Sequence, residues 1–504
     1  MCLPTLEWER LPAPAPAAPA CERGRTPVHP SNQELLVDRT SQTTRASMSH
    51  AIMSFALCLG LGTPFLAGAA TPLWNARYGD GYGQWAQDIT IVEKLNVGMT
   101  GSYIGTLDLG GGALETATDQ AVYFAKLTQD GKHVWSKGFI SSDRVEGQSV
   151  AGDAEGRLAG TGWFFGKVNF GGKDFEAAFG GSAGFVVMFD TNGKHLWSNA
   201  FDQAQPLSIT IDAKGDVVVT GQVLAATDLG CGALAWKGNA DAFVVKYSGE
   251  TGKCLWSRVF GDVMSQWSAG VATDATGNIV ITGGFTSTMN MDGWGLKAAP
   301  STPAPEADLF VAKLEPSAGK VVWAYNYGDG DSQQAADVAI DLSGNIIVTG
   351  GMGGKMTLGT TTLVSAGLVD AFVAKFNSKG TPMWAKRFGD AEIQAGEAVS
   401  IGDDYEIFVA ARCRGSMAPA AATCQSEDAA YLQLSPSGTL RQAGAFGNAA
   451  YQGAHGIAAV VADTGVFYLT GEFQSSINFG LGPMVATKCL AYLCTDAFLA
   501  KFHQ

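Results

Sequence analysis

One six-residue segment recurs along the chain, and this repetition limits the possible folds more than any other feature. Four copies are close to D-A-F-V-A-K and three are weaker; they end at Lys126, Met188, Lys246, Lys313, Lys375, Gln433 and Lys501. Successive copies are therefore separated by 58 to 68 residues. A period of this size indicates an array of equivalent units, each of which buries its faces against its neighbours.

Each unit contains four short strand candidates and no segment with the length and periodicity of a helix. In the clearest copy, two apolar segments flank an Asp-x-x-Gly turn within residues 271–283, and the D-A-F-V-A-K segment follows them. The fourth segment has a Trp four residues before an aromatic residue, as in Trp256 and Phe260. Such units, arranged radially, form propeller blades. The sequence predicts an all-β, seven-bladed propeller with four-stranded antiparallel blades.

The two ends of the repeat array indicate how the ring closes. Residues 73–78 have the pattern of a fourth strand, but no first three strands precede them. The last unit has three strands and ends with residues 496–502. We therefore expect the N-terminal strand to join the C-terminal three, which removes an exposed sheet edge. The predicted propeller spans residues 71–504.

The first 70 residues differ from the rest of the chain. Residues 1–47 are interpreted as a disordered or spurious extension, because they include the Pro- and Ala-rich stretch 11–20. Residues 48–70 are interpreted as a signal peptide that begins at Met48 and ends in small residues. An uncleaved anchor is the alternative, since twenty apolar residues can span a bilayer. We expect secretion to the periplasm, cell surface or medium, and no stable membrane span after cleavage.

The charge of the chain limits its partners. The formal net charge is −14, and the sequence contains no basic run. An acidic surface repels the phosphate backbone, so we expect no nucleic-acid partner. We expect a monomer.

Two repeated motifs carry a resemblance to a known family. They are V-A-x-D-x-x-G-N-[IV]-[IV]-V-T-G, as at residues 338–350, and D-A-F-V-A-K-[LF], as at residues 370–376. They resemble the seven-bladed β-propeller (SBBP) repeats, which are related to NHL repeats, and the resemblance covers about residues 73–504. It implies a propeller of the kind found in secreted or surface bacterial proteins. It implies no catalytic residues.

The connectors between units share a second motif, Gly-[Asp/Asn]-x-x-x-Gln. We expect them on one face of the propeller, the loop face, together with the long loops between second and third strands. The Asp, Asn and Gln side chains of the motif would form a polar ring on that face: Asp80, Gln84, Asp262, Gln266, Asp329, Gln333, Asp390, Gln394, Asn448 and Gln452. A structural role is favoured, in which Asp caps the turn and Gln ties neighbouring blades. The alternative is a ligand or cation site, with Asp329 and Asp331 as candidate Ca²⁺ ligands.

The propeller region contains six cysteines, for which a secreted protein permits disulfides. Cys413 and Cys424 flank one loop, and Cys489 and Cys494 lie in the corresponding loop of the last blade, so both pairs are predicted to bond. Cys231 and Cys254 fall at opposite ends of one strand, about 20 Å apart at roughly 3.3 Å per residue. They are predicted not to bond to each other.

Few residues suggest catalysis. His455 opens the last blade near the axis and is the one histidine considered for a functional role. Residues 180–184 match G-x-S-x-G, but a loop precedes them and a strand follows, so the match is interpreted as accidental. The repeated Trp residues are expected to pack between blades. We assign no catalytic or cofactor-binding residue and no cofactor apart from possible Ca²⁺.

The sequence favours a secreted, non-catalytic propeller that binds an unknown protein or glycan on its loop face, with the long loop 286–307 and its Trp294 as one contributor. A hydrolase or lyase with an active site on the same face is the first alternative. A quinoprotein-like enzyme is the second, since residues 251–256 are similar to the Gly-Lys-x-x-Trp motif of quinone-dependent propellers.

Overall fold

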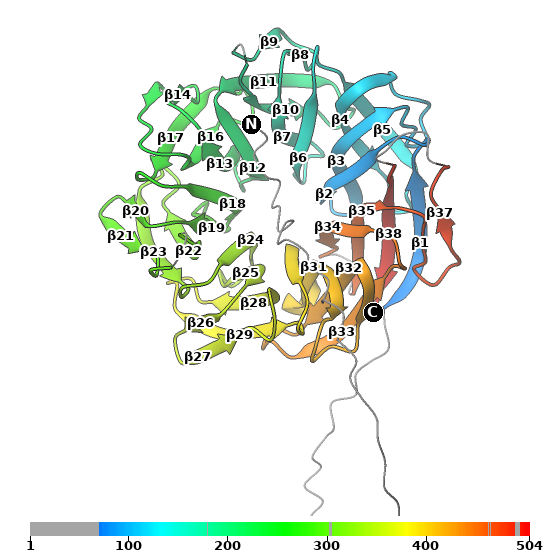
Figure 1. Ribbon diagram of the computed structural model, residues 1–504. Coiled ribbons are helices and arrows are strands. Elements are labelled where there is room, and N and C mark those ends of the chain that lie inside the picture. Colours follow the sequence, from blue (N-terminus) through cyan, green and yellow to red (C-terminus); the bar gives the residue numbers. More distant parts are fainter. Residues whose placement is uncertain (1–69, 179, 302–304, 462, 464, 489–493) are drawn as a thin grey trace, which may run out of the picture. The chain divides into compact units, whose positions relative to one another are not determined.

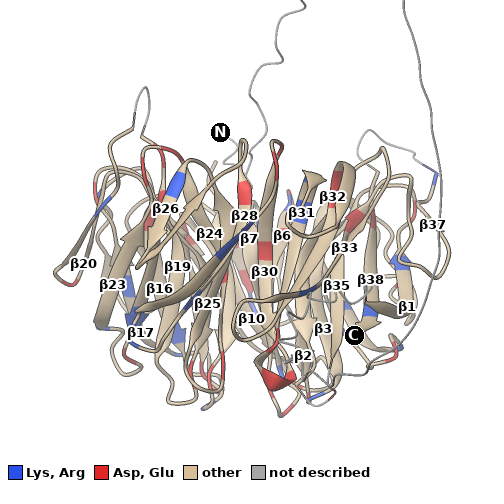
Figure 2. Cartoon of the chain, turned by 90° about the horizontal axis from the view of Figure 1, so that it is seen from below, with Lys and Arg blue, Asp and Glu red and all other residues tan. Residues whose placement is uncertain are grey.

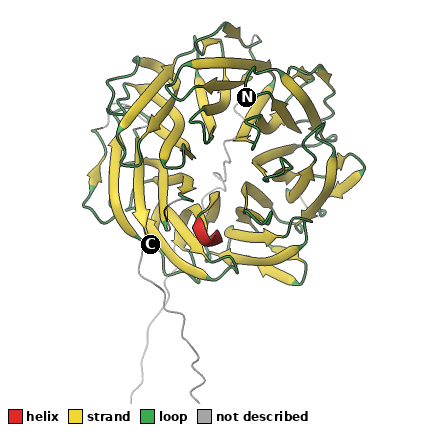
Figure 3. Ribbon diagram, turned by 180° about the vertical axis from the view of Figure 1, so that it is seen from behind, coloured by secondary structure: helices red, strands yellow, loops and turns green. Residues whose placement is uncertain are grey.

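The computed structural model describes residues 70–504 except 179, 302–304, 462, 464 and 489–493. Within residues 64–504, seven four-stranded antiparallel sheets surround a central axis (Figure 1). The predicted fold is therefore confirmed. The only helix among the described residues is a three-residue 3₁₀ turn, η1 (Asp403–Tyr405), drawn red in Figure 3.

The first four blades follow one another around the ring, each with its innermost strand first. Blade 1 contains β2 (Gln84–Val92), β3 (Asn96–Gly105), β4 (Ala117–Leu127) and β5 (His133–Phe139). Blade 2 contains β6 (Val145–Gly152), β7 (Leu158–Phe164), β10 (Ala183–Phe189) and β11 (His195–Asp202). Blade 3 contains β12 (Ala204–Ile211), β13 (Val217–Val223), β16 (Asp241–Tyr247) and β17 (Cys254–Phe260), and blade 4 contains β18 (Gln266–Thr273), β19 (Ile279–Phe285), β22 (Asp308–Leu314) and β23 (Val321–Tyr327).

The last three blades complete the ring. Blade 5 contains β24 (Gln333–Ile340), β25 (Ile346–Met352), β28 (Asp370–Phe376) and β29 (Pro382–Phe388). Blade 6 contains β30 (Gln394–Ile401), β31 (Ile407–Ser416), β32 (Thr423–Leu434) and β33 (Leu440–Phe446). Blade 7 contains β34 (Gln452–Ala459), β35 (Val466–Phe473), β38 (Asp496–His503) and, from the other end of the described chain, β1 (Thr71–Tyr78).

Strand β1 closes the ring as the sequence predicts. It pairs antiparallel with β38, with Trp74 opposite Lys501 and Tyr78 opposite Ala497. The blue and red strands lie side by side in Figure 1. Pairing across 400 residues leaves blade 7 with the same four strands as the others, so no β38 edge is exposed.

In six blades an outer-strand Trp packs against the next blade, as expected from the repetition of these residues, and blade 6 has Gln442 at this position. The indole Nε1 of Trp135 donates to the Thr191 carbonyl at 3.1 Å, and Trp197 donates to the Gly249 carbonyl at 2.9 Å. Each indole also covers a turn glycine of the following blade; Gly193 has φ +77° and a Cβ there would lie 2.6 Å from Trp135. Glycine is therefore required by both the backbone conformation and the close approach.

The Lys that ends the repeated segment is explained by a buried ion pair. Lys246 Nζ lies 2.6 Å from an Asp212 oxygen, and both side chains are almost fully buried. Lys313 pairs with Asp274 at 2.9 Å and Lys375 with Asp341 at 3.0 Å. The Lys of the third strand thus pairs with the Asp of the turn between the first two, which accounts for two signature residues by one contact.

The loops after the second strands form a further hairpin in five blades. These hairpins are β8 (Lys167–Asn169) with β9 (Asp174–Glu176), β14 (Thr227–Asp228) with β15 (Ala233–Leu234), β20 (Thr288–Met291) with β21 (Trp294–Lys297), β26 (Lys355–Leu358) with β27 (Thr361–Val364), and β36 (Ser476–Ile477) with β37 (Met484–Val485). Their tips reach the start of the outer strand: a Cβ on Gly172 would lie 2.7 Å from the His195 ring. Each hairpin therefore folds back along the outside of its blade.

This folding back overturns the prediction for Cys231 and Cys254, which form a disulfide with 5.5 Å between their Cα atoms. The prediction placed Cys231 at the far end of strand β16 from Cys254. Cys231 instead lies at the tip of the β14–β15 hairpin, which brings it to the start of β17. Tyr247 Oη supports the tip by donating to the Leu229 carbonyl at 2.7 Å.

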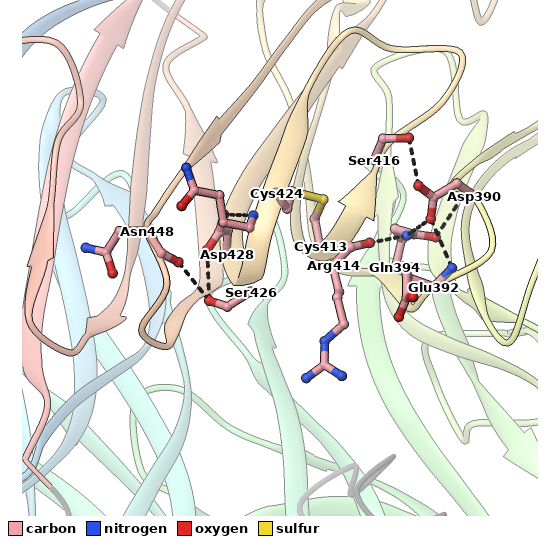
Figure 4. The surroundings of a disulfide bond; sticks show 11 residues. Asp390, Glu392, Gln394, Cys413, Arg414, Ser416, Cys424, Ser426, Asp428 and Asn448 are labelled. Atoms are coloured by element: carbon pink, nitrogen blue, oxygen red, sulfur yellow. Dashed lines mark hydrogen bonds between the residues drawn. A yellow bond between two sulfur atoms is a disulfide. The ribbon is translucent and has the colours of Figure 1, made fainter. Parts of the chain in front are cut away.

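In blade 6 the strands β31 and β32 are themselves extended, and a second disulfide links them. Cys413 and Cys424 are joined, with 5.9 Å between their Cα atoms (Figure 4), which is the predicted pairing. Cys489 lies outside the described residues, so its pairing with Cys494 stays a prediction. The two disulfides are typical of proteins from oxidising compartments.

Two further observations concern the surface. Charged residues are sparse along the strands, and acidic residues recur in the loops at both ends of the propeller (Figure 2). Within the described part of the chain, no helix has the length and apolar character needed to cross a membrane. Residues 48–69, the main part of the predicted signal peptide, lie outside the described residues, as do residues 1–47.

Candidate functional site

The predicted polar ring forms structural clamps. Gln333 is fully buried; its Oε1 accepts from the Asp329 backbone N–H at 3.0 Å, and its Nε2 donates to Asp329 Oδ1 at 2.9 Å and to the Gly353 carbonyl at 2.8 Å. Its backbone N–H donates to the Ala307 carbonyl of the preceding blade at 2.8 Å. One residue therefore ties the connector, the loop after the second strand and the neighbouring blade together.

The same clamp recurs in the other four blades that carry the motif. All five Gln side chains are fully buried, and each donates to a carbonyl at or shortly after the end of the second strand, namely Ile104, Thr288, Gly353, Arg414 and Gln474. Figure 4 shows the version in blade 6, with Gln394 between Asp390 and Arg414. Each Gln is thus engaged within the protein.

The glycine of the Gly-[Asp/Asn]-x-x-x-Gln motif is required by a close contact with another side chain. A Cβ on Gly261 would lie 2.1 Å from Oδ1 of Asp241, the residue that begins the third strand. The equivalent contacts are Gly79 with Asp496, Gly328 with Asp308, Gly389 with Asp370 and Gly447 with Asp428, at 2.0 to 2.3 Å. Glycine is therefore needed because a buried carboxylate rests against its Cα.

The candidate calcium ligands lie in one of these clamps. Asp329 Oδ1 accepts from the Asp331 backbone N–H at 2.9 Å, and Oδ2 accepts from the Lys355 backbone N–H at 2.7 Å. Both oxygens of Asp329 are thus engaged in the turn. Across the described residues, no three His, Cys, Asp or Glu side chains lie close enough together to hold a metal. Calcium binding at Asp329 and Asp331 remains a prediction.

A cluster of charged residues interrupts the pseudosymmetry where blades 6 and 7 meet. We call it the blade 6–7 cluster: Glu397, Arg412, Glu427, Tyr451, His455 and Glu472. In the other blades the position of Glu472 holds Ser102, Trp163, Gln222, Gly284, Gly351 and Arg412, and the position shared by Glu397 and His455 holds Gln87, Gln148, Leu207, Ala269 and Ala336. The charges are therefore specific to one sector, and the repeat alone does not account for them.

Within the cluster, Glu472 connects two residues of the last blade. It is 3% exposed, and its Oε1 lies 2.9 Å from His455 Nε2 and accepts from Tyr451 Oη at 2.9 Å. Its other oxygen, Oε2, is buried without a hydrogen-bond partner. A Cβ on Gly453 would lie 2.8 Å from both His455 Nε2 and Tyr451 Oη, so glycine lets these side chains close over the backbone.

Arg412 provides the positive charge of the cluster. Its Nε lies 2.8 Å from Glu397 Oε1, and its Nη1 lies 3.3 Å from Glu427 Oε1. Burial lowers the pKa of Arg412, but the two carboxylates outweigh burial and the pKa is raised. With three carboxylates and one guanidinium, the cluster is negative overall when His455 is neutral.

The histidine and tyrosine respond to these charges. Burial lowers the pKa of His455, but the adjacent Glu472 outweighs burial, so the pKa is raised above its ordinary value. Burial, followed by the charge of Glu472, raises the pKa of Tyr451. His455 is thus held near a buried carboxylate that favours its protonated form.

The cluster borders a cavity of about 400 Å³ on the propeller axis. His455 and Glu397 line it from blades 7 and 6, and Asp88 and Asp337 line it from blades 1 and 5. Strands β2, β6, β12, β18, β24, β30 and β34 all contribute to the lining. The cavity is therefore formed only when all seven blades have assembled.

The two aspartates of the cavity connect neighbouring blades. Asp88 Oδ2 accepts from Ser149 Oγ at 2.7 Å and from the Val150 N–H at 2.9 Å, and Asp337 Oδ2 accepts from the Val399 N–H at 2.8 Å. Burial raises the pKa of Asp88 to about 6 and that of Asp337 to about 7, although these hydrogen bonds lower both. The charge of Asp88 adds to the rise at Asp337, so the two groups repel each other.

Two other sequence features have structural explanations. Ser182 of the G-x-S-x-G match is buried directly before β10, with no helix following it, so the match is not a nucleophile elbow. Trp294 lies on β21, 38% exposed, with its ring centroid 6.0 Å from that of Tyr325. Trp294 is therefore on the outer rim of blade 4 rather than at the cavity.

Fold and site together define a seven-bladed β-propeller with a charged sector on its central channel. No protein-family model matches the chain. An uncharacterized WD repeat-containing protein, L264 of Acanthamoeba polyphaga mimivirus, is 25% identical over 180 residues, which are 33% of this chain and 13% of the viral protein. The repeats thus have a distant WD-repeat relative.

The chain is also similar in fold to solved propellers. The Dos1 propeller has a TM-score of 0.42 and 9% identity, covering 86% of this chain and 95% of that one. YCF48 bound to a D1 peptide has a TM-score of 0.41 and 10% identity, covering 88% and 100%. BamB from Moraxella catarrhalis has a TM-score of 0.39 and 10% identity, covering 86% and 100%.

Of the residues in the blade 6–7 cluster, only His455 was singled out from the sequence. The missing signal was departure from the repeat: aligning the seven units places charged residues at Glu397, Arg412 and Glu472, where most other units have small, amide or aromatic side chains. Residues that recur from unit to unit occupy structural positions, whereas the residues that depart from the repeat lie together where blades 6 and 7 meet.

Proposed function

We propose that this protein is a secreted or surface-exposed, non-catalytic binding protein that receives a protein or glycan partner at the loop face and central channel. The observation that supports the proposal is the blade 6–7 cluster. Buried charges are costly, and Arg412 with its two carboxylates has no equivalent in the other units. Stability of the repeat does not require them, so we attribute them to recognition.

Secretion is part of the proposal. It is supported by the two disulfides, which form readily outside reducing compartments, and by the signal-peptide pattern of residues 48–70. We further propose that the units are SBBP repeats and that the protein acts as a monomer. A strong or weak copy of the D-A-F-V-A-K segment forms the third strand of every blade, and the ring is closed by its own β1 strand.

Binding is tested by presenting the full-length secreted protein to glycan and peptide arrays and measuring the hits by surface plasmon resonance. The matched pair of variants is His455→Gln in the cluster and His133→Gln at the start of β5, where His133 Nε2 lies 3.0 Å from Ser136 Oγ. The proposal expects at least a tenfold loss of affinity for His455→Gln only. Hits that bind both variants like the wild type would contradict it.

One observation favours an acid–base enzyme, the hydrolase or lyase considered from the sequence, as a second candidate. His455 lines the cavity while Glu472 lies behind it, the arrangement by which a carboxylate orients an imidazole base. This alternative is tested with chromogenic glycosides and esters. Turnover that His455→Gln abolishes, while His133→Gln preserves it, would support an enzyme over a binding protein.

A further inference from the structure

We propose that the central cavity binds an aliphatic organic cation: an ammonium or guanidinium group carried on a hydrocarbon chain. The inference rests on the proposed binding function and specifies the chemistry of the ligand. The cavity lining combines acidic and aliphatic side chains, and the blade 6–7 cluster adjoins it.

The charged lining has one sign. Asp88, Asp337 and Glu397 line the cavity, His455 is the only other titratable residue there, and the described lining contains no Lys or Arg. Arg412 lies behind Glu397 and is already paired with two carboxylates. A ligand that enters therefore meets three carboxyl groups in a partly dehydrated space, where a positive charge is attracted more strongly than in water.

The side of the cavity formed by blades 3 and 4 is mainly aliphatic. At the lining position where blades 6 and 7 carry Glu397 and His455, blades 3, 4 and 5 carry Leu207, Ala269 and Ala336. Ile209 and Val271 extend this wall deeper into the channel and complete a set of aliphatic side chains. A ligand with a charged end and a hydrocarbon chain matches both sides at once.

The separation of the carboxylates favours an organic cation over a metal ion. No three acidic or histidine side chains in the described residues converge to coordinate one ion. Asp88 and Asp337 each accept hydrogen bonds from backbone N–H groups and keep further lone pairs for other donors. A guanidinium spreads five N–H donors over a planar fork, and a diamine carries two ammonium groups at opposite ends of its chain, so such cations can reach separated acceptors.

A bound cation would act on two features of the cavity and the adjoining cluster. Burial raises the pKa of Asp337, and the charge of Asp88 across the channel adds to the rise, so a cation between the two groups would offset this repulsion. Glu472 Oε2 is buried in the cluster with no donor, although its partner His455 reaches the cavity. Glu472 itself does not line the cavity, so a bound cation would act on it through His455 rather than directly.

The test is isothermal titration calorimetry of the full-length protein with cadaverine and agmatine. The neutral control is 1,5-pentanediol and the anionic control is glutarate, both similar in chain length to cadaverine. The proposal expects both cations to bind at least tenfold more tightly than the diol and glutarate not to bind. Equal binding of cadaverine and the diol would overturn it.

Variants locate the site. Glu397→Gln and Asp337→Asn are expected to weaken cadaverine binding at least tenfold, while Glu250→Gln, which removes an exposed charge from a turn of blade 3, leaves it unchanged. If a carboxylate variant misfolds, Ala336→Lys serves instead, since its own ammonium would occupy the cavity and abolish binding. Unchanged cadaverine affinity in folded Glu397→Gln, or in Ala336→Lys, would overturn the proposal.

Two sources of the cation are distinguished in the same experiment. If the cation is a lysine or arginine side chain of a partner protein, a Lys-containing peptide should bind at least tenfold more tightly than cadaverine. If it is a free polyamine, cadaverine should bind at least tenfold more tightly than the peptide. If partners from the arrays bind in a manner that depends on His455 but no cation binds, the proposed binding function stands and the proposed ligand is wrong. Loss of both would remove both proposals.

Discussion

Cys231 and Cys254 are joined by a disulfide across 23 residues of sequence, and their Cα atoms lie 5.5 Å apart. The bond fastens the tip of the β14–β15 hairpin to the start of the outer strand β17. In blades 1 and 2 the same position of the outer strand holds His133 and His195, which lie against Gly111 and Gly172 in the loop after the second strand. Blade 3 thus replaces a packing contact with a covalent one.

Removing this bond is expected to destabilise the propeller. The double variant Cys231→Ser/Cys254→Ser should lower the free energy of unfolding by about 3 kcal/mol, because the disulfide no longer restricts the unfolded chain. Urea denaturation measures the loss. Cys413→Ser/Cys424→Ser, which opens a shorter loop, is the comparison and should lose slightly less. Peptide mapping that finds free thiols at Cys231 and Cys254 would contradict the structure.

Gly261, which precedes Asp262 of the polar ring, is expected to be required for full stability. Gly261→Ala would place a Cβ 2.1 Å from the buried Asp241 Oδ1, and the resulting overpacking should cost about 1–3 kcal/mol. Gly295→Ala is the control, because its Cβ meets nothing within 4 Å. Chemical denaturation compares the two. Equal stability of both variants would show that the carboxylate moves aside without cost.

The buried glutamines are expected to contribute to stability rather than to binding. Gln333→Ala removes the donor to the Gly353 carbonyl and should cost about 1–3 kcal/mol, the range for an unsatisfied buried group. The adjacent Gln334, which is only partly buried and donates to Ser332 Oγ, provides a milder control as Gln334→Ala. Thermal unfolding reports the difference. A loss of partner binding without a loss of stability would instead indicate a functional ring.

The cavity carboxyl groups are expected to make stability depend on pH. Burial raises the pKa of Asp337 to about 7 in the folded protein, above its ordinary value of 3.8, so the folded state binds more protons than the unfolded state between these values. Its contribution to stability is complete below pH 4 and is lost as pH rises through about 7. Asp88, with a pKa of about 6, acts in the same direction.

Asp337→Asn tests this linkage, because an amide cannot ionise. Between pH 4 and 8, the wild type should lose stability more steeply with rising pH than the variant, as measured by urea denaturation at each pH. Asp88 and His455 also line the cavity and also have raised pKa values, so part of the slope should remain in the variant. Parallel curves for both proteins would show that Asp337 does not titrate in this range.

The fold and its closure were predictable because their determinants are local and repeated. The D-A-F-V-A-K segment recurs seven times when weak copies are counted, the Trp segment six times and the Asp-x-x-Gly turn four times, and every copy indicates the same strand or turn. The incomplete units at residues 73–78 and 496–502 then leave one way to complete a blade. The Gly-[Asp/Asn]-x-x-x-Gln clamp was interpretable for the same reason, since a recurring residue implies a recurring contact.

The hairpins and the cavity required the tertiary structure. Cys231 was misplaced because a loop that folds back on its own blade leaves no periodic trace in the sequence. Asp88, Asp337, Glu397 and His455 lie 58 to 367 residues apart, and they share a cavity only because seven blades close into a ring. Local sequence specifies strands and turns, but which side chains meet on the axis depends on the angle at which successive blades pack.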